Sequence, residues 1–230
     1  MCQLPQSLML FAAGLGTRMG SLTAHRPKPL IAVGGRMLID HALAQAAGVQ
    51  RVVVNLHYLP DQIRAHLSGR SGILFSHETE TILETGGGLR RALPLLRSDP
   101  VFTLNSDAVW TGPGALAQLS SVWDKDRMDG LLLLVLKGRA SGHSGKGDFT
   151  MDAGGRLMRG VDLVYTGAQI IVTGSLTSIA ENAFSLNLVW NKMAAEGRLF
   201  GVIHQGGWCD VGRPEAIPLA EALLQGSADV

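Results

Sequence analysis

The most regular feature of the chain is an alternation of short apolar runs and helix-like segments between residues 8 and 136. Continuous apolar runs bounded by turn residues are typical of strands that are covered on both faces. Such strands are predicted at residues 8–12, 52–56, 73–77, 101–105 and 131–136. Helices are predicted between them, at residues 37–48, 61–69, 87–96 and 114–125. This alternation predicts an α/β fold with a Rossmann-like, mostly parallel sheet flanked by helices.

The pattern changes after residue 136, where a segment rich in glycine and polar residues begins. The elements predicted beyond it are a strand at 164–173, a helix at 186–197, strands and a turn within 198–212, and a helix at 213–226. No internal repeat or linker interrupts the chain. We therefore predict a single domain that spans residues 1–230.

Composition narrows the class of protein. Of the 230 residues, 46% are hydrophobic and 17% are charged, which is typical of a globular chain. The formal net charge is +1 and no run of like charges occurs, so nucleic acid and membrane surfaces are not predicted partners. The four tryptophans are predicted to pack in or beside the core rather than to stack on a base: Trp110, Trp123, Trp190 and Trp208.

The cysteines and the N-terminal segment indicate the cellular compartment of the protein. Cys2 and Cys209 are the only cysteines, and one pair makes no disulfide framework. The apolar run near the N-terminus has no basic segment ahead of it, which argues against a secretory signal. The longest fully apolar run, 131–136, is too short to cross a bilayer. A cytoplasmic protein is predicted.

The stretch "FAAGLGTRMGSLTAHRPKPL" places a glycine turn and two cations directly after the first predicted strand. Ligands of open parallel sheets bind at this edge. Gly14 and Gly16 are predicted to take positive φ and to let backbone N–H groups approach an anion. Arg18 offers a bidentate fork for phosphate, and the flanking prolines are predicted to hold Lys28 in an extended segment. The stretch predicts a phosphate site.

Two common phosphate motifs do not fit this stretch. The dinucleotide fingerprint G-x-G-x-x-G is one residue narrower than the spacing of Gly14, Gly16 and Gly20. The acidic residue that should follow would be Asp40, which falls in a predicted helix. No Walker A string is present. A Rossmann-type dehydrogenase is therefore the weakest of the functional alternatives.

Four motifs together resemble the sugar-1-phosphate nucleotidyltransferases. They are "AAGLGTRM…RPKPL", "ETGGGLRRALPLL", "LNSDAVW" and "GGWCDVGRPE", in the family's order and spacing. Within the family the resemblance is greatest to the short bacterial N-acetylmuramate-1-phosphate uridylyltransferases, which share the glycine triplet and a "GKGDF"-like segment. The chain departs from the family pattern at Ser21, where a proline is usual, and at Ser106, where "NSD" replaces "NGD".

The resemblance implies the fold of nucleotide-diphospho-sugar transferases and a reaction between a nucleoside triphosphate and a sugar 1-phosphate. The sugar phosphate oxygen attacks the α-phosphorus in line and pyrophosphate leaves. In such chemistry, positioning and charge stabilisation matter most. The implied catalytic residues are Arg18 and Lys28. The residues implied to bind the nucleotide are Ala12, Ala13, Gly14, Leu15, Gly16, Thr17, Glu84, Gly86, Gly87 and Asn105.

The resemblance further implies a magnesium ion and a sugar subsite. Asp107 and Asp210 are implied to converge on Mg²⁺, which suits one or two carboxylates together with substrate phosphates. Lys146, Gly147 and Asp148 are implied to contact the sugar. If the sugar carries the lactyl carboxylate of muramate, Lys146 and Arg139 are the predicted cations for it. The glycine-rich loop 137–149 is a candidate lid.

Several alternatives stay open at this point. The nucleotide and sugar are predicted to be UTP and N-acetylmuramate 1-phosphate, with a role in nucleotide-sugar biosynthesis and peptidoglycan recycling. GTP with mannose 1-phosphate, or UTP or dTTP with glucose 1-phosphate, are the neighbouring possibilities. A regulatory module that binds nucleotide without turnover belongs to another class, and the presence of both cations and both aspartates argues against it. The assembly is expected to be a monomer or a small homo-oligomer.

Overall fold

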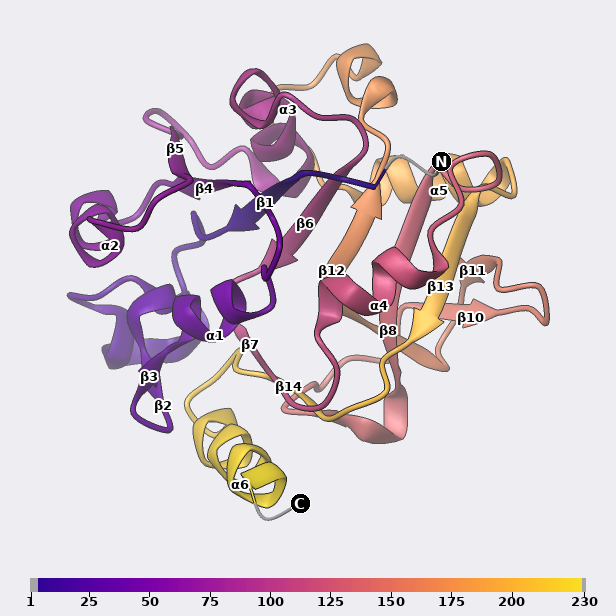
Figure 1. Ribbon diagram of the computed structural model, residues 1–230. Helices are drawn as coiled ribbons and strands as arrows, with labels where there is room; N and C mark the ends of the chain where they lie inside the picture. The colour runs from indigo at the N-terminus through magenta and orange to yellow at the C-terminus, as the bar shows by residue number, and fades with distance from the viewer. Residues whose placement is uncertain (1–3, 229–230) are drawn as a thin grey trace.

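The computed structural model describes residues 4–228, in which a nine-stranded mixed sheet forms the centre of the molecule (Figure 1). The strands follow one another as β11-β10-β12-β6-β1-β4-β5, and β8 joins β12 to β13. Their bounds are β1 Ser7–Phe11, β4 Arg51–Leu56, β5 Ile73–His77, β6 Val101–Asn105, β8 Gly130–Leu136, β10 Phe149–Met151, β11 Leu157–Arg159, β12 Leu163–Ile171 and β13 Leu199–Ile203.

The predicted parallel arrangement is confirmed for the first half of the chain. β1 pairs in parallel with both β4 and β6, and β4 pairs in parallel with β5. The later half is different, because β12 enters between β6 and β8 and is antiparallel to both. The sequence predicted β8 and β12 as strands but did not indicate that β12 inserts beside β6. Strand order depends on pairings between distant segments.

Helices cover both faces of the sheet, as the alternation predicted (Figure 1). Several are shorter than their predicted ranges; the first ends at Ala44 instead of running to Gly48. The α-helices are α1 Leu38–Ala44, α2 Pro60–Leu67, α3 Glu84–Leu96, α4 Ala115–Val122, α5 Asn187–Ala195 and α6 Ala216–Ala228. Short 3-10 turns occupy η1 Thr17–Thr23, η2 Lys28–Leu30, η3 Lys137–Arg139 and η4 Gly174–Ser178.

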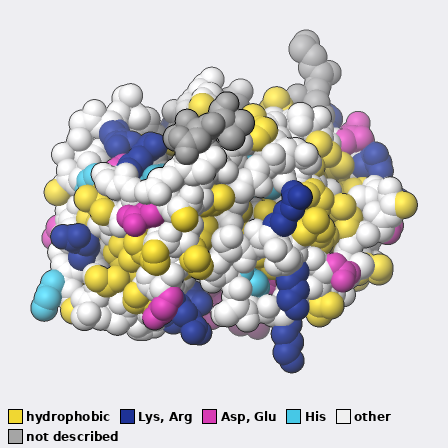
Figure 2. Space-filling view, turned by 90° about the horizontal axis from the view of Figure 1, so that it is seen from below, with side chains coloured by type: hydrophobic (Ala, Val, Ile, Leu, Met, Phe, Trp, Pro, Cys, Tyr) yellow, Lys and Arg dark blue, Asp and Glu magenta, His cyan; other side chains and the backbone are white. Residues whose placement is uncertain are grey.

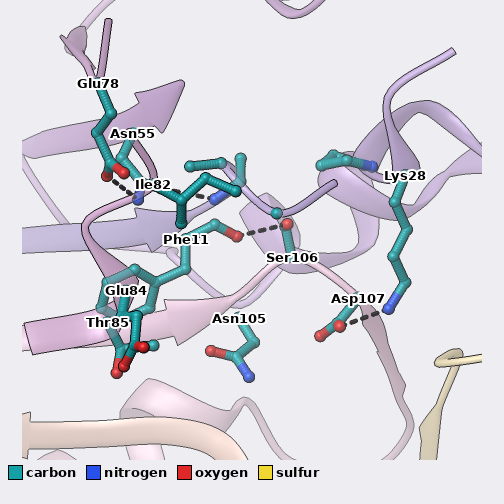
Figure 3. A pocket seen from close by; sticks show the side chains of 14 residues that line it. Phe11, Lys28, Asn55, Glu78, Ile82, Glu84, Thr85, Asn105, Ser106 and Asp107 are labelled. Atoms are coloured by element: carbon teal, nitrogen blue, oxygen red, sulfur yellow. Dashed lines mark hydrogen bonds and ion pairs between the residues drawn. The ribbon is translucent and has the colours of Figure 1, made fainter. Parts of the chain in front are cut away.

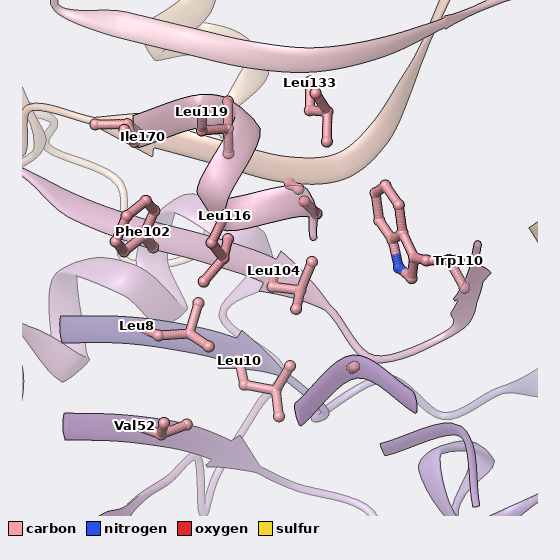
Figure 4. Packing of buried hydrophobic residues seen from close by; sticks show 14 of the residues in the cluster. Leu8, Leu10, Val52, Phe102, Leu104, Trp110, Leu116, Leu119, Leu133 and Ile170 are labelled. Atoms are coloured by element: carbon pink, nitrogen blue, oxygen red, sulfur yellow. The ribbon is translucent and has the colours of Figure 1, made fainter. Parts of the chain in front are cut away.

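Successive residues of the central strands enter two different cores. Leu8 and Leu10 pack with Leu116 and Leu119 of α4 on one face, as Figure 4 shows. Met9, which lies between them, packs in a second cluster on the other face. Because side chains alternate across a strand, a continuous apolar run serves a sheet that is covered on both sides. The four tryptophans are at most 7% exposed, as their predicted packing role requires.

A small three-stranded sheet, β7-β14-β9, lies beside the central one, with α6 packed against β14. Its strands are β7 Ala108–Trp110, β14 Trp208–Asp210 and β9 Ala140–Ser141. A short hairpin pairs β2 Ala32–Val33 with β3 Arg36–Met37, and its first strand, β2, contacts α6. Because β14 pairs with β7 in this small sheet, a late segment of the chain lies beside the loop that follows β6.

The surface shows no continuous basic area on the face in Figure 2, where Lys and Arg side chains stand apart among acidic and apolar ones. Within residues 4–228, no helix is both long enough and apolar enough to span a membrane.

His204 gives the fold a pH dependence that is open to measurement. It is 5% exposed, its Nδ1 accepts from the Gln118 side chain at 2.8 Å, and its Nε2–H donates to the Thr111 carbonyl at 3.1 Å. Burial lowers the pKa of His204, and the carbonyls of Gly207 and Thr111 partly oppose this. The folded state therefore binds this proton less readily than the unfolded state does.

We expect the free energy of unfolding to fall as the pH drops below about 6.5, by at most about 1.4 kcal/mol per pH unit from this group. Urea titrations between pH 5 and 8 measure the slope. His204→Gln should flatten it, and His25→Gln, at an exposed position, should leave it unchanged. Equal slopes in the wild type and in His204→Gln would contradict the assignment.

Candidate active site

A cavity of about 220 Å³ opens at the C-terminal ends of β1 and β6, where a parallel sheet places its ligands (Figure 3). Segments far apart in the sequence contribute to its wall. The lining residues are Phe11, Ala12, Ala13, Gly14, Lys28, Pro29, Asn55, Glu78, Ile82, Glu84, Thr85, Asn105, Ser106 and Asp107. The structure thus brings six of the predicted nucleotide-binding and catalytic residues into one cavity, together with the metal candidate Asp107.

The glycine turn after β1 is only partly as predicted. Gly16 has φ +65°, and a Cβ there would lie 2.9 Å from the Cβ of Lys28, so glycine is required. Gly14 is not among the residues with positive φ and needs no such freedom, which corrects the prediction for that position. Leu15 and Thr17 are exposed and, like Gly16, lie outside the cavity wall.

A buried hydrogen-bond relay, which the sequence analysis did not predict, holds the turn in place. The Ala12 N–H donates to Asn55 Oδ1 at 2.7 Å, and Asn55 Nδ2 donates to Glu78 Oε1 at 2.7 Å. Glu78, 1% exposed, also accepts from the backbone N–H of Leu83 at 2.8 Å. A Cβ on Gly88 would lie 2.8 Å from Glu78 Oε1, so this glycine makes room for the relay. The only available signal was a polar residue inside the run "VVVNL".

We expect Asn55→Ala to lower the free energy of unfolding by about 1–3 kcal/mol, because the buried Ala12 N–H and Glu78 carboxylate both lose a partner. The freed turn should also weaken nucleotide binding. Denaturant unfolding and nucleotide titration measure the two effects. A variant with wild-type stability and wild-type nucleotide affinity would show that the relay does not support the turn.

Lys28 and Asp107 form an ion pair at the mouth of the cavity, with Nζ and Oδ2 2.6 Å apart (Figure 3). Lys28 is 8% exposed, so its ammonium is held in one place. Pro27 is extended, but Lys28 itself opens the short 3-10 turn η2, which corrects the predicted extended conformation. The two prolines still restrict the backbone around it. The result is a fixed cation among the residues expected to meet phosphates.

Asp210 reaches Asp107 through strand pairing. β14 pairs antiparallel with β7, so Asp210 lies opposite Ala108, and the Val211 N–H donates to the Asp107 carbonyl at 2.9 Å. Burial and the nearby Asp107 carboxylate raise the pKa of Asp210, and Lys28 and Arg18 counteract this rise. Arg18 is exposed on η1 and acts on Asp210 across space without a hydrogen bond to it. Two carboxylates and two cations therefore meet here.

The glycine triplet after Thr85 has a packing role that differs from the predicted one. Glu84 and Thr85 line the cavity, with Glu84 at φ +58°. A Cβ on Gly86 would lie 2.3 Å from the Phe184 ring, and one on Gly87 would lie 2.3 Å from the Asn182 carbonyl. Neither glycine lines this cavity. They lie in the first turn of α3, packed closely against residues 182–184, so the structure does not bring them to the cavity with the other implied nucleotide contacts.

The C-terminal end of β6 is tied to β1 by Ser106. Its Oγ donates to the Phe11 carbonyl at 2.6 Å, and its backbone takes no positive φ, so serine is accommodated where the family has glycine. The preceding Asn105 lines the cavity, and a Cβ on Gly167 would lie 2.8 Å from that of Asn105. The irregularity in β12 around Gly167 thus leaves room for the Asn105 side chain.

A second cavity, of about 250 Å³, shares Phe11, Thr85 and Asn105 with the first. Its remaining lining residues are Asp148, Tyr165, Ser185, Leu186, Asn187 and Trp190. Asp148 is fixed there, because its Oδ2 accepts from the Tyr165 N–H at 2.9 Å. Of the other predicted sugar contacts, Gly147, at φ +100°, packs against Val161, and Lys146 is exposed outside the wall.

The loop 137–149 is attached near the two aspartates. β9, within it, pairs with β14, and a Cβ on Gly142 would lie 2.1 Å from the Asp210 carbonyl oxygen. His143 is close enough to Asp210 to act on it electrostatically, a neighbour that the sequence did not indicate. One end of the loop is therefore fixed beside Asp210, and its movement as a lid stays a prediction.

Comparison with known proteins gives close relatives. N-acetylmuramate alpha-1-phosphate uridylyltransferase of Caulobacter vibrioides is 41% identical over 240 residues, covering 97% of this chain and 99% of the relative. The protein of the same name from Neisseria meningitidis serogroup B is 32% identical, covering 94% and 96%. Mannose-1-phosphate guanyltransferase of Yarrowia lipolytica is 28% identical, covering 90% of this chain and 61% of that protein.

Solved structures agree in fold. UDP-glucose pyrophosphorylase complexed with UDP-glucose has a TM-score of 0.78 at 15% identity, covering 97% of this chain and 99% of that one. Inositol-1-phosphate CTP transferase from T. maritima has a TM-score of 0.73 at 17% identity, covering 98% and 99%. The family model of the MobA-like NTP transferase domain matches residues 8–144. With the cavity at the strand ends and full-length relatives of this kind, the chain belongs to the MobA-like NTP transferase family and, within it, to the sugar-1-phosphate nucleotidyltransferases.

Proposed function

We propose that the protein transfers a uridylyl group from UTP to N-acetylmuramate 1-phosphate and releases pyrophosphate. The observation that carries the reaction is the ion pair of Lys28 and Asp107 in the cavity wall, with Asp210 close enough to both to interact with them electrostatically. The choice of base and sugar is supported by the two full-length relatives with that activity in their names. Nucleotide-sugar formation for peptidoglycan recycling is the corresponding cellular role.

In this proposal the first cavity binds the nucleotide. Ala12, Ala13 and Gly14 present the turn to base and ribose, and Glu84, Thr85 and Asn105 line the same cavity. Leu15, Gly16 and Thr17 continue the turn toward Arg18, which meets the phosphates that leave as pyrophosphate. Gly86 and Gly87 contribute by bringing α3 close to residues 182–184.

Lys28 is proposed to lie between the α-phosphate and the incoming sugar phosphate. Its ammonium offsets the charge that builds up as the sugar phosphate oxygen attacks. In-line transfer of this kind needs fixed charges aimed at the phosphates rather than a covalent intermediate. The burial of Lys28 and its ion pair hold the cation ready before the substrates bind.

Asp107 and Asp210 fit the requirements of Mg²⁺. This ion uses one or two carboxylates and takes its remaining ligands from phosphates and water. Among the described residues, no group of three or more acidic, histidine or cysteine side chains is placed to hold a metal ion. The remaining ligands of an ion at Asp107 and Asp210 would therefore be substrate oxygens and water. The raised pKa of Asp210 beside Asp107 marks a place where a cation is favoured. When bound, the ion supplies charge neutralisation at the phosphates.

The second cavity is proposed to receive the sugar. It adjoins the first cavity at Phe11, Thr85 and Asn105, which line both, so a sugar phosphate bound there would lie beside the nucleotide. Asp148 keeps one carboxylate oxygen free to accept a sugar hydroxyl, and Gly147 lets the chain turn beside it. A single domain, a cytoplasmic location and a monomeric or small homo-oligomeric state complete the proposal.

The test is pyrophosphate release with Mg²⁺ over a grid of nucleotides and sugar 1-phosphates. UTP with N-acetylmuramate 1-phosphate should turn over with the highest kcat/KM. GTP with mannose 1-phosphate, and UTP or dTTP with glucose 1-phosphate, are the comparison wells. If one of these pairs has the highest turnover, the proposed sugar or base is wrong and the proposed type of reaction is retained. A folded protein that binds UTP and turns over no pair would contradict the proposed reaction.

A further inference from the structure

Arg159, at the end of β11, is a cation fixed on aromatic surface beside the second cavity. Its guanidinium carbon lies 4.7 Å from the centre of the Phe149 ring and 5.9 Å from that of Trp190. Arginine packs well on aromatic faces and keeps its charge at every physiological pH. Arg159 rests on these rings with one face and is still an exposed residue, so the polar edge of its guanidinium faces solvent.

The hydrogen bonds of Arg159 go to neutral partners. Nε donates to Asn191 Oδ1 at 2.8 Å, and Nη2 donates to Asn187 Oδ1 at 2.7 Å and to the Asn187 carbonyl at 3.4 Å. Among the described residues no carboxylate lies within ion-pair distance of it, and Nη1 makes no hydrogen bond. Two asparagine residues thus orient the guanidinium, and no described carboxylate forms an ion pair with it.

Asn187 links this cation to the cavity wall. Its side-chain amide is fixed at both ends, because Oδ1 accepts from Arg159 while Nδ2 donates to Ser185 Oγ at 2.9 Å. Ser185, Asn187 and Trp190 all line the second cavity. Asp148, on the same wall, is near enough to influence Arg159 electrostatically. Arg159 therefore stands at the rim of the proposed sugar pocket.

The cations predicted from the sequence are placed differently. Lys146 and Arg139 are both exposed, and neither lines the first or the second cavity. Neither makes an ion pair or a side-chain hydrogen bond within the described part of the chain. A long side chain without a partner loses rotamer entropy when it is made to hold a ligand, whereas Arg159 is already held.

We infer that Arg159 is the specificity residue that binds a carboxylate on the sugar 1-phosphate, so that the second cavity selects acidic over neutral sugars. The inference rests on the proposed function, and it identifies the carboxylate as the feature of the sugar that the protein recognises. The Nη1 hydrogens make no hydrogen bond within the described chain, so they are the part of the guanidinium that is available to a carboxylate. N-acetylmuramate differs from N-acetylglucosamine by a lactyl ether that carries this group.

The experiment compares kcat/KM for N-acetylmuramate 1-phosphate and N-acetylglucosamine 1-phosphate, with UTP and Mg²⁺ at fixed concentrations. Arg159→Gln should lower the value for the acidic sugar roughly tenfold to a hundredfold, as expected for the loss of charge-assisted hydrogen bonds. The value for the neutral sugar should stay within about twofold. Arg159→Lys, which keeps the charge and loses the fork, should fall between.

Arg127→Gln is the matched control, because Arg127 is an exposed arginine that rests on the Phe200 ring and lines neither cavity. It should leave the ratio of the two sugars at its wild-type value. Arg159→Met keeps packing against the two rings and gives the same test should the glutamine variant not fold. A wild-type preference for the neutral sugar would overturn both the proposed sugar and the role of Arg159. A wild-type preference for the acidic sugar that survives in Arg159→Gln would overturn the role of Arg159 alone.

Discussion

Replacing Lys28 with methionine should lower kcat by about 10²–10³-fold while the protein stays folded. In the proposed reaction the ammonium stabilises charge that develops in the transition state, and the loss of one such fixed group commonly has this effect. Methionine fills much of the same buried volume without the charge. Pyrophosphate release under saturating substrates measures kcat, and nucleotide titration shows whether the ground-state complex still forms.

Arg26→Met is the matched control, because Arg26 is an exposed cation two residues before Lys28. It should retain wild-type kcat. Lys28→Met should also lower the melting temperature in the absence of Mg²⁺, since Asp107 then faces Asp210 without its cation. A Lys28→Met protein with near wild-type kcat would show that the ammonium supports the fold and does not act on the phosphates.

Asp210→Asn should have opposite effects on activity and on stability. We expect kcat to fall at least a hundredfold, because one of two proposed carboxylate ligands of Mg²⁺ is lost. We expect the melting temperature without Mg²⁺ to rise. The folded-state pKa of Asp210 is raised, so its ionisation destabilises the fold as the pH rises above the unfolded value, and the neutral asparagine avoids this.

Thermal unfolding at pH 7.5 with and without Mg²⁺ separates the two effects. The wild type should gain stability when Mg²⁺ is added, and Asp210→Asn should gain less. Asp61→Asn, at an exposed position on α2, is the control and should respond to Mg²⁺ as the wild type does. An Asp210→Asn variant that melts below the wild type in the absence of Mg²⁺ would contradict the repulsion between the two aspartates.

The sequence predicted much of the fold because the relevant signals are local. Each buried strand is a short apolar run, and the glycine turn with Arg18 and Lys28 falls within one stretch of "AAGLGTRMGSLTAHRPKPL". The phosphate-site argument needed only that this stretch follows a strand of a parallel sheet. The resemblance of four motifs to a nucleotidyltransferase family rests on contiguous residues as well, and the family relationship is confirmed by the relatives.

Other features depend on which distant segments pair. The insertion of β12 between β6 and β8 follows from pairing with both, and Asp210 meets Asp107 only because β14 pairs with β7. The glycine triplet is a similar case: the resemblance implied that Gly86 and Gly87 contact the nucleotide, whereas the close approach of residues 182–184 makes them part of a packed helix turn.

The sequence by itself determined the central strands, the glycine turn after the first of them and the family, since each is encoded in residues that are neighbours along the chain. Tertiary structure decided which polar residues support that turn and which cation lies beside the second cavity. Asn55 and Glu78 are 23 residues apart, and Arg159 and Asn187 are 28 residues apart. Such contacts form only when burial brings separate segments together, and no local pattern of apolar or polar residues specifies them.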